Sequence, residues 1–188
     1  MNPSRSESPA GTSLLTQDYF SLFGLPRQFD LQADHVESAW KRLQSVVHPD
    51  RFAGGGDLQR RMALQWSTRI NEAHQVLREP VGRATYLLGL WGVDVQAESN
   101  TSMPEDFLLR QMAWREELEE IQTAGPGAGT QASRARLLQD VLEIWQAGLK
   151  GLSAALSAEP SREDLARAAQ LVRQLMFVKK FEQELTAL

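Results

Sequence analysis

The stretch SVVHPDRF (residues 45–52) joins two segments whose apolar residues recur with the period of an α-helix. Pro49 must end the first helix, expected over residues 32–47, because the residue before a proline is pushed out of the helical region. Its apolar face carries Val36, Trp40, Leu43 and Val47. The stripe of the second helix, expected over residues 57–78, comprises Met62, Trp66, Ile70, Ala73 and Leu77. Two facing stripes and a polar, glycine-rich connection predict an antiparallel helical hairpin.

Helical periodicity continues along the rest of the chain, and no segment shows the period-two alternation of a strand. Further helices are expected over residues 18–23, 81–91, 104–123, 131–156 and 161–187. Ser161 and Asp164 are spaced as in a capping box, and AGPGAGT (residues 124–130) is a break between helices. The sequence therefore predicts an all-α protein. Its parts are a disordered tail (1–17), an N-terminal hairpin domain (18–91), a linker (92–103) and a C-terminal three-helix bundle (104–188).

Composition excludes several classes of function. The 188 residues contain no cysteine, which removes disulfides, thiolate catalysis and cysteine zinc sites and fits a reducing, cytoplasmic compartment. No run approaches the roughly 20 apolar residues of a membrane span, and the first 17 residues lack the apolar core of a secretory signal. A net charge of −4 gives no reason to expect nucleic acid as a partner. Residues 18–91 hold 9 basic and 8 acidic side chains, whereas residues 92–188 hold 10 and 15, which indicates two modules with different partners.

The tripeptide His48-Pro49-Asp50 is suited to protein docking. Pro49 fixes its own φ and stiffens the loop, Asp50 supplies a carboxylate, and His48 offers two ring nitrogens for polar contacts. A stiff, charged loop is typical of a recognition site, and without a pocket or a second acid or base it would be a poor catalytic centre. In the simpler alternative, His48 and Asp50 only cap the helix end and the turn.

The surroundings of this tripeptide resemble the J domain of DnaJ-type proteins. DYFSLF (residues 18–23) precedes it and INEA (residues 70–73) follows it. The resemblance implies that His48, Pro49 and Asp50 engage an HscA/DnaK-type chaperone and stimulate its ATP hydrolysis. It also implies assistance from Lys41 and Arg42, for which a merely solvated helix face is an equal alternative. His74 stands where such domains carry an aromatic residue, and we expect it at the surface or partly in the core.

The helix expected over residues 104–123 carries apolar side chains on two faces. One face holds Phe107, Gln111, Trp114, Leu118 and Ile121. The opposite face holds Leu108, Leu109 and Met112, accompanied by Glu105, Glu116 and Glu120. In the last helix Phe177 lies within a polar sector. Because one stripe suffices to join a bundle, a second one calls for another partner; packing against the linker or the first domain is the alternative.

Together with HPDRF, the segments FLL (107–109), REELEEI (115–121) and VRQLMF (172–177) resemble the HscB family, the J-type co-chaperones of iron–sulfur cluster biogenesis. The resemblance implies a co-chaperone with no enzymatic activity, cofactor or metal that presents an IscU-type scaffold to the chaperone. The scaffold patch would comprise Leu108, Leu109, Met112 and Phe177, with Glu116 and Glu120 as its acidic rim. Ala113 departs from the family, where an acidic residue is frequent, so electrostatic steering would be weaker. A Cys-rich zinc segment is absent, as in bacterial members.

Two other functions would require features that this sequence lacks. A general J protein for unfolded clients would carry a Gly/Phe-rich stretch and Cys-rich zinc repeats, which this sequence lacks. A metal-dependent hydrolase would use His48 and Asp50. Its ligand cage is hard to build because the three histidines (His35, His48 and His74) lie on separate segments.

Overall fold

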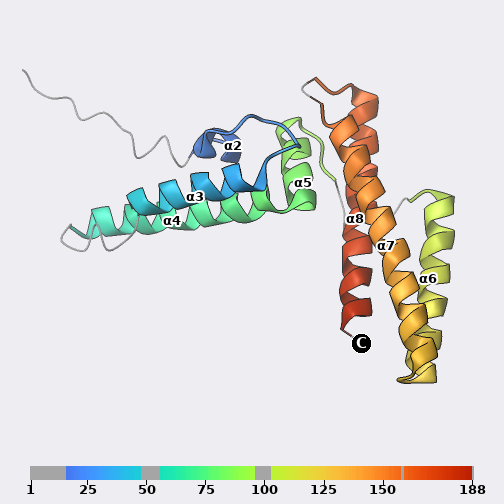
Figure 1. Cartoon of the computed structure of the whole chain (residues 1–188). Helices are drawn as coiled ribbons and strands as arrows, with labels where there is room; N and C mark the ends of the chain where they lie inside the picture. The colour runs from blue at the N-terminus through green and yellow to red at the C-terminus, as the bar shows by residue number, and fades with distance from the viewer. Residues whose placement is uncertain (1–15, 48–55, 96–102, 158, 188) are drawn as a thin grey trace, which may run out of the picture. The chain divides into compact units, whose positions relative to one another are not determined.

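The computed structural model describes residues 16–47, 56–95, 103–157 and 159–187 (Figure 1). Within these residues every regular element is a helix, so the predicted all-α class is confirmed. The chain splits into two compact units that divide between Arg83 and Ala84. This division lies inside helix α5 (Pro80–Leu90), whereas the sequence places the end of the first domain after Trp91. The domain limits derived from the sequence therefore stay predictions.

In the first unit, α3 (Ala33–Val47) and α4 (Asp57–Arg78) pack against each other, and α2 (Tyr19–Phe23) contacts both. The helical hairpin is thus confirmed. Its core is narrower than the predicted stripes, because Trp40, Leu43, Met62 and Trp66 are only half-buried. The small residues Ala39 and Ala63 are buried instead, at 2% and 0% exposure. They join the predicted Val36, Val47, Ile70, Ala73 and Leu77, which are buried as expected.

The polar ends of α2 hold this short helix in place. Asp18 caps its N-terminus by accepting a hydrogen bond from the Ser21 backbone N–H at 3.1 Å. Burial would raise the pKa of Asp18, but hydrogen bonds from Arg27 and Ser21 outweigh burial and lower the pKa to about 2. Gly24 ends the helix with φ at 65°, a left-handed conformation that favours glycine. A five-residue helix thus has a defined start and end.

His74 lies partly in the core of the first unit, as predicted. Its ring stacks on Trp40 with centroids 4.6 Å apart, and its Nε2 lies 2.9 Å from Oε2 of Glu37. The Trp40 indole N–H in turn donates to Oδ1 of Asn71 at 3.0 Å. The imidazole therefore takes the packing place of an aromatic ring and links α3 to α4.

The second unit contains α6 (Glu105–Ala124), α7 (Ala128–Ala155) and α8 (Arg162–Thr186), and α7 packs against both other helices. The capping box is confirmed, since Ser161 and Asp164 satisfy each other's backbone N–H groups at the start of α8. The predicted break over residues 124–130 is too long, because α7 begins at Ala128. Gly125, with φ at 69°, makes the turn, and Gly127 caps α7 in an extended conformation.

One apolar cluster joins the three helices of the second unit. Its buried members are Phe107, Trp114, Leu118, Ile121, Leu137, Val141, Val178, Phe181 and Leu185. The second unit also includes residues 84–95, where Val95 is buried and its carbonyl oxygen accepts a hydrogen bond from Nη1 of Arg173 at 3.1 Å. None of the described helices has the length and apolar character needed to cross a bilayer.

Gly148 lies where α7 approaches α8 closely. A Cβ added there would lie 2.6 Å from Cδ2 of Leu175, a side chain that is only 1% exposed. We therefore expect Gly148→Ala to lower the free energy of unfolding by about 1–2 kcal/mol, since overpacking outweighs the gain in helix propensity. Urea unfolding followed by circular dichroism measures this change.

Gly129→Ala on the same helix is the matched control, because an added Cβ there meets nothing within 4 Å. We expect this variant to be neutral or slightly more stable. Equal stability of both variants would mean that α8 adjusts to the added methyl group.

Candidate functional site

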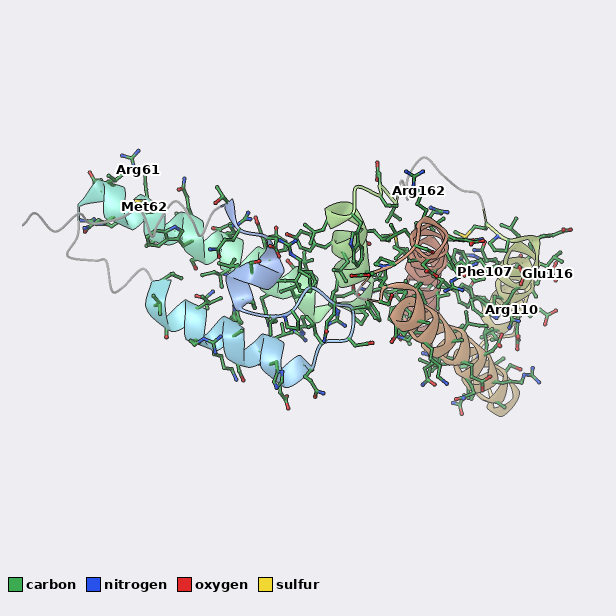
Figure 2. All side chains as sticks on the ribbon, turned by 90° about the horizontal axis from the view of Figure 1, so that it is seen from above. Arg61, Met62, Phe107, Arg110, Glu116 and Arg162 are labelled. Atoms are coloured by element: carbon green, nitrogen blue, oxygen red, sulfur yellow. The ribbon has the colours of Figure 1, made fainter. Side chains whose placement is uncertain are left out.

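Helix α6 presents two different apolar faces, as its sequence predicts. Phe107, Trp114, Leu118 and Ile121 are buried against the bundle, at exposures of 9% or below. On the other side Leu108 is 42% exposed, and Leu109 and Met112 are each 61% exposed. Figure 2 shows Phe107 on the side of α6 that faces the bundle and Glu116 on the opposite side.

Polar contacts with α7 hold α6 in this rotation. The Trp114 indole N–H donates to Oδ2 of Asp140 at 2.6 Å, and Nη1 of Arg110 lies 3.2 Å from Oδ1 of the same carboxylate. Nη2 of Arg136 on α7 lies 3.1 Å from Oε1 of Glu117. Because these three contacts lie on one flank of α6, the side that carries Leu108 and Met112 faces the solvent.

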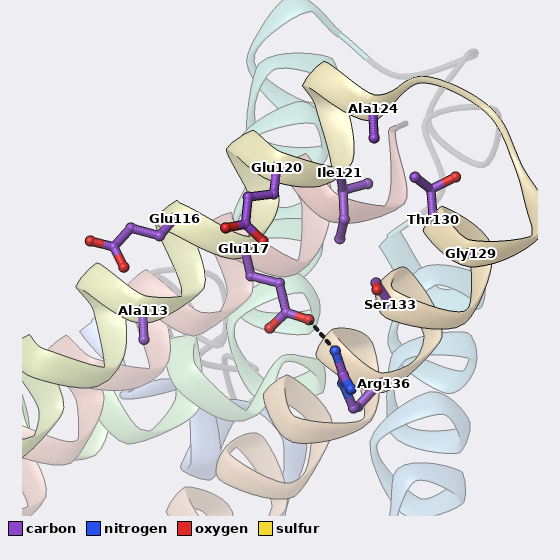
Figure 3. A pocket seen from close by; sticks show the side chains of 10 residues that line it. All are labelled: Ala113, Glu116, Glu117, Glu120, Ile121, Ala124, Gly129, Thr130, Ser133 and Arg136. Carbon is purple, nitrogen blue, oxygen red and sulfur yellow. Dashed lines mark hydrogen bonds and ion pairs between the residues drawn. The ribbon is translucent and has the colours of Figure 1, made fainter.

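The predicted acidic rim lies at the edge of a hollow between α6 and α7. Glu116, Glu117, Glu120 and Arg136 line this hollow, which has a volume of about 430 Å³ (Figure 3). Glu117 reaches across it to Arg136, whereas Glu116 and Glu120 are exposed and, within the described residues, form no ion pair. Two carboxylates are therefore available to attract a basic partner, although exposed charges add more to association rate than to affinity.

Ala113 lines the same hollow one turn before Glu117. Its side chain is small, apolar and uncharged. The negative charge of this edge is consequently restricted to the C-terminal half of α6.

Phe177 does not share the open surface of Leu108, Leu109 and Met112. It is half-buried, forms a T-shaped contact with Phe107 at 6.0 Å between ring centroids, and stacks on Phe181 at 6.1 Å. The guanidinium of Arg115 lies over its ring, 5.7 Å from the centroid. The structure thus places Phe177 against Phe107, the residue that precedes Leu108 in the chain. It also places the charged group of Arg115 over the ring of Phe177.

Arg115 is a residue of this region that sequence reasoning missed. A signal was present, since Arg115 follows Leu108 by seven residues and Met112 by three, and therefore continues their stripe along α6. Its contact with a ring on α8 depends on tertiary packing and has no sign in the local pattern.

In the first unit, the two predicted basic residues of α3 are solvent-exposed. Nζ of Lys41 lies 3.7 Å from Oε1 of Glu37, one turn away, and Arg42 is exposed beside it. His48, Pro49 and Asp50 lie outside the described residues, so their roles remain predictions. Within the part of the chain that the structure describes, no cluster of three histidine or carboxylate side chains could hold a metal ion.

Comparisons with known proteins bear on both units. Residues 103–186 match the protein family described as HSCB C-terminal oligomerisation domain. The co-chaperone protein HscB homolog of Azoarcus sp. (strain BH72) is 45% identical over 171 residues, which cover 91% of this chain and 93% of that protein. Its counterpart in Burkholderia mallei (strain SAVP1) is 45% identical over 173 residues, covering 92% and 94%.

Solved structures give the same result. The chaperone HscB from Vibrio cholerae has a TM-score of 0.78 and 33% identity, with 91% of this chain and 96% of that chain covered. The human co-chaperone protein HscB has a TM-score of 0.81 at 24% identity, covering 92% of this chain and 82% of that one, which shows a common fold.

Proposed function

The chain belongs to the HscB family of co-chaperones, and on this basis we propose that it is an adaptor for iron–sulfur cluster assembly. In this proposal the C-terminal bundle binds an IscU-type scaffold protein. The J domain then presents the scaffold to an HscA-type chaperone of the DnaK class and stimulates ATP hydrolysis by that chaperone.

The observation that carries the scaffold half of the proposal is the exposed side of α6. Leu108, Leu109 and Met112 stand in the solvent on a helix whose opposite face already fills a complete core. Apolar side chains that share one exposed patch are typical of a binding surface. Glu116 and Glu120 beside them supply a charged rim, the usual anatomy of a protein interface.

The chaperone half of the proposal rests on His48, Pro49 and Asp50 and on the exposed Lys41 and Arg42. Placing the two sites on one chain raises the effective concentration of scaffold near the chaperone. The protein then needs no chemistry, metal or cofactor of its own. Its place of action in this proposal is the cytoplasm, where chaperone, ATP and scaffold meet.

A coupled ATPase measurement tests this function. We expect the chain to accelerate ATP hydrolysis by the purified HscA-type chaperone, and a folded IscU-type scaffold to raise that rate further than either protein does alone. Calorimetry should show a one-to-one complex of chain and scaffold without the chaperone. If a permanently unfolded protein binds the chain and raises the ATPase rate as well as the scaffold does, the chain serves general clients and the adaptor proposal fails.

A further inference from the structure

The contact between Arg115 and Phe177 has a consequence for scaffold docking. Arg115 lies on α6 beyond Met112, and its guanidinium covers two rings of α8, at 5.7 Å from the centroid of Phe177 and 5.4 Å from that of Phe181. The same guanidinium pairs with Glu184 on α8. The side chains of Arg115 and Glu184 are 47% and 35% exposed, so this arrangement lies at the surface.

Phe177 is half-buried, so part of its ring is open to the solvent and the rest lies against neighbouring side chains. It makes an edge-to-face contact with Phe107 and a stacked contact with Phe181, both of which are buried in the bundle. The guanidinium of Arg115 lies over the ring, 5.7 Å from its centroid, and therefore covers part of its surface. An apolar side chain of a partner that packs on this face of the ring would have to displace the guanidinium.

We propose that Arg115 is a latch over Phe177, held by Glu184, which the scaffold displaces when an apolar scaffold side chain takes the place of the guanidinium on the ring. This inference rests on the proposed scaffold-binding function. It adds a specificity-determining pair, Arg115 and Glu184, to the predicted patch and its acidic rim.

The two interactions that hold Arg115 over Phe177 are of a kind that a binding partner can break. An exposed cation–π contact and an exposed ion pair are each weak, so the closed state is favoured only by a modest factor. A partner that binds the open state alone has an apparent affinity reduced by the open fraction. Removing the latch should therefore tighten binding by about three- to tenfold, and the gain should appear partly in the association rate.

Three variants test the latch against the IscU-type scaffold by surface plasmon resonance. Arg115→Ala uncovers the ring and should lower Kd by about three- to tenfold with a faster association. Glu184→Gln loosens the guanidinium and should act in the same direction with a smaller effect. Arg167→Ala, the control, removes an exposed arginine of α8 that pairs with Asp164 on the same helix, and should leave Kd unchanged.

A double-mutant cycle ties the effect to the ring. In a Phe177→Ala background, Arg115→Ala should no longer tighten binding, because nothing remains to be uncovered. Any of three results would overturn the latch. These are an equal gain in affinity in both backgrounds, a loss of affinity with Arg115→Ala, and unchanged affinity for both single variants. Thermal unfolding of every variant confirms that it is folded.

The two proposals fail differently. If the unaltered chain does not bind the scaffold at all, the proposed function falls. If the chain binds and Leu108→Ala weakens binding, but neither Arg115→Ala nor Glu184→Gln tightens it, only the latch falls.

Discussion

Replacing His48 by glutamine is expected to reduce stimulation of the partner chaperone's ATPase to the basal rate. Glutamine keeps one acceptor and two donor hydrogens but loses the planar ring with nitrogens on both sides. A flexible side chain beside Pro49 would not offer the same pair of contacts. Single-turnover ATP hydrolysis by the purified HscA-type chaperone, measured against increasing concentrations of the chain, gives the result directly.

The matched control is His35→Gln, which changes an exposed histidine of α3 in the same unit. We expect full stimulation from this variant. Calorimetry with the scaffold should give the same affinity for both variants, since neither site lies in the bundle. Undiminished stimulation by the His48 variant would remove the J-domain role of the tripeptide and leave it as a helix-ending turn.

The second large effect is expected from Leu108→Ala combined with Phe177→Ala. Interface anchors of this kind each cost about 1–2 kcal/mol when truncated, so the pair should weaken scaffold binding by about 2–4 kcal/mol in total. Isothermal titration calorimetry with the IscU-type scaffold measures this loss.

Stability and binding can be separated within this pair. Leu108 is exposed, so Leu108→Ala should leave the free energy of unfolding within about 0.5 kcal/mol of its original value, while Phe177→Ala removes a half-buried ring. Leu142→Ala is the matched control, because Leu142 is 39% exposed on α7 and Leu108 is 42% exposed on α6. We expect the control to bind the scaffold normally. Original affinity in the Leu108 variant would reassign the patch to another role.

The faces of α6 could be predicted from the sequence because they depend on local geometry. A period of 3.6 residues decides which side chains share a face, and the core requires one apolar stripe. Phe107 and Trp114 are therefore buried and Leu109 is exposed, as expected. Likewise, the capping box of Ser161 depends on residues three apart and was recognisable without the fold.

Contacts between helices could not be predicted in this way. The pattern placed Phe177 in a polar sector of α8, but tertiary packing turns it toward Phe107 and under Arg115. Similarly, Glu116, Glu117 and Glu120 look alike in the sequence, and only the position of Arg136 on α7 distinguishes Glu117, which it pairs, from the other two, which are exposed. Contacts between side chains on different helices depend on how each helix is rotated about its axis. The periodicity of the sequence does not specify this rotation accurately enough to predict single contacts.

The hydrogen bond between Arg173 and Val95 bears on how the protein can be divided for separate expression. A fragment that begins at Met103, where the family match starts, would lack the Val95 carbonyl oxygen. Arg173 would then lose its acceptor, although its Nε is already a buried donor with no partner among the described residues. A fragment that begins at Ala84 retains this acceptor and the buried Val95 side chain. A fragment that preserves the bundle should therefore begin before the linker predicted over residues 92–103.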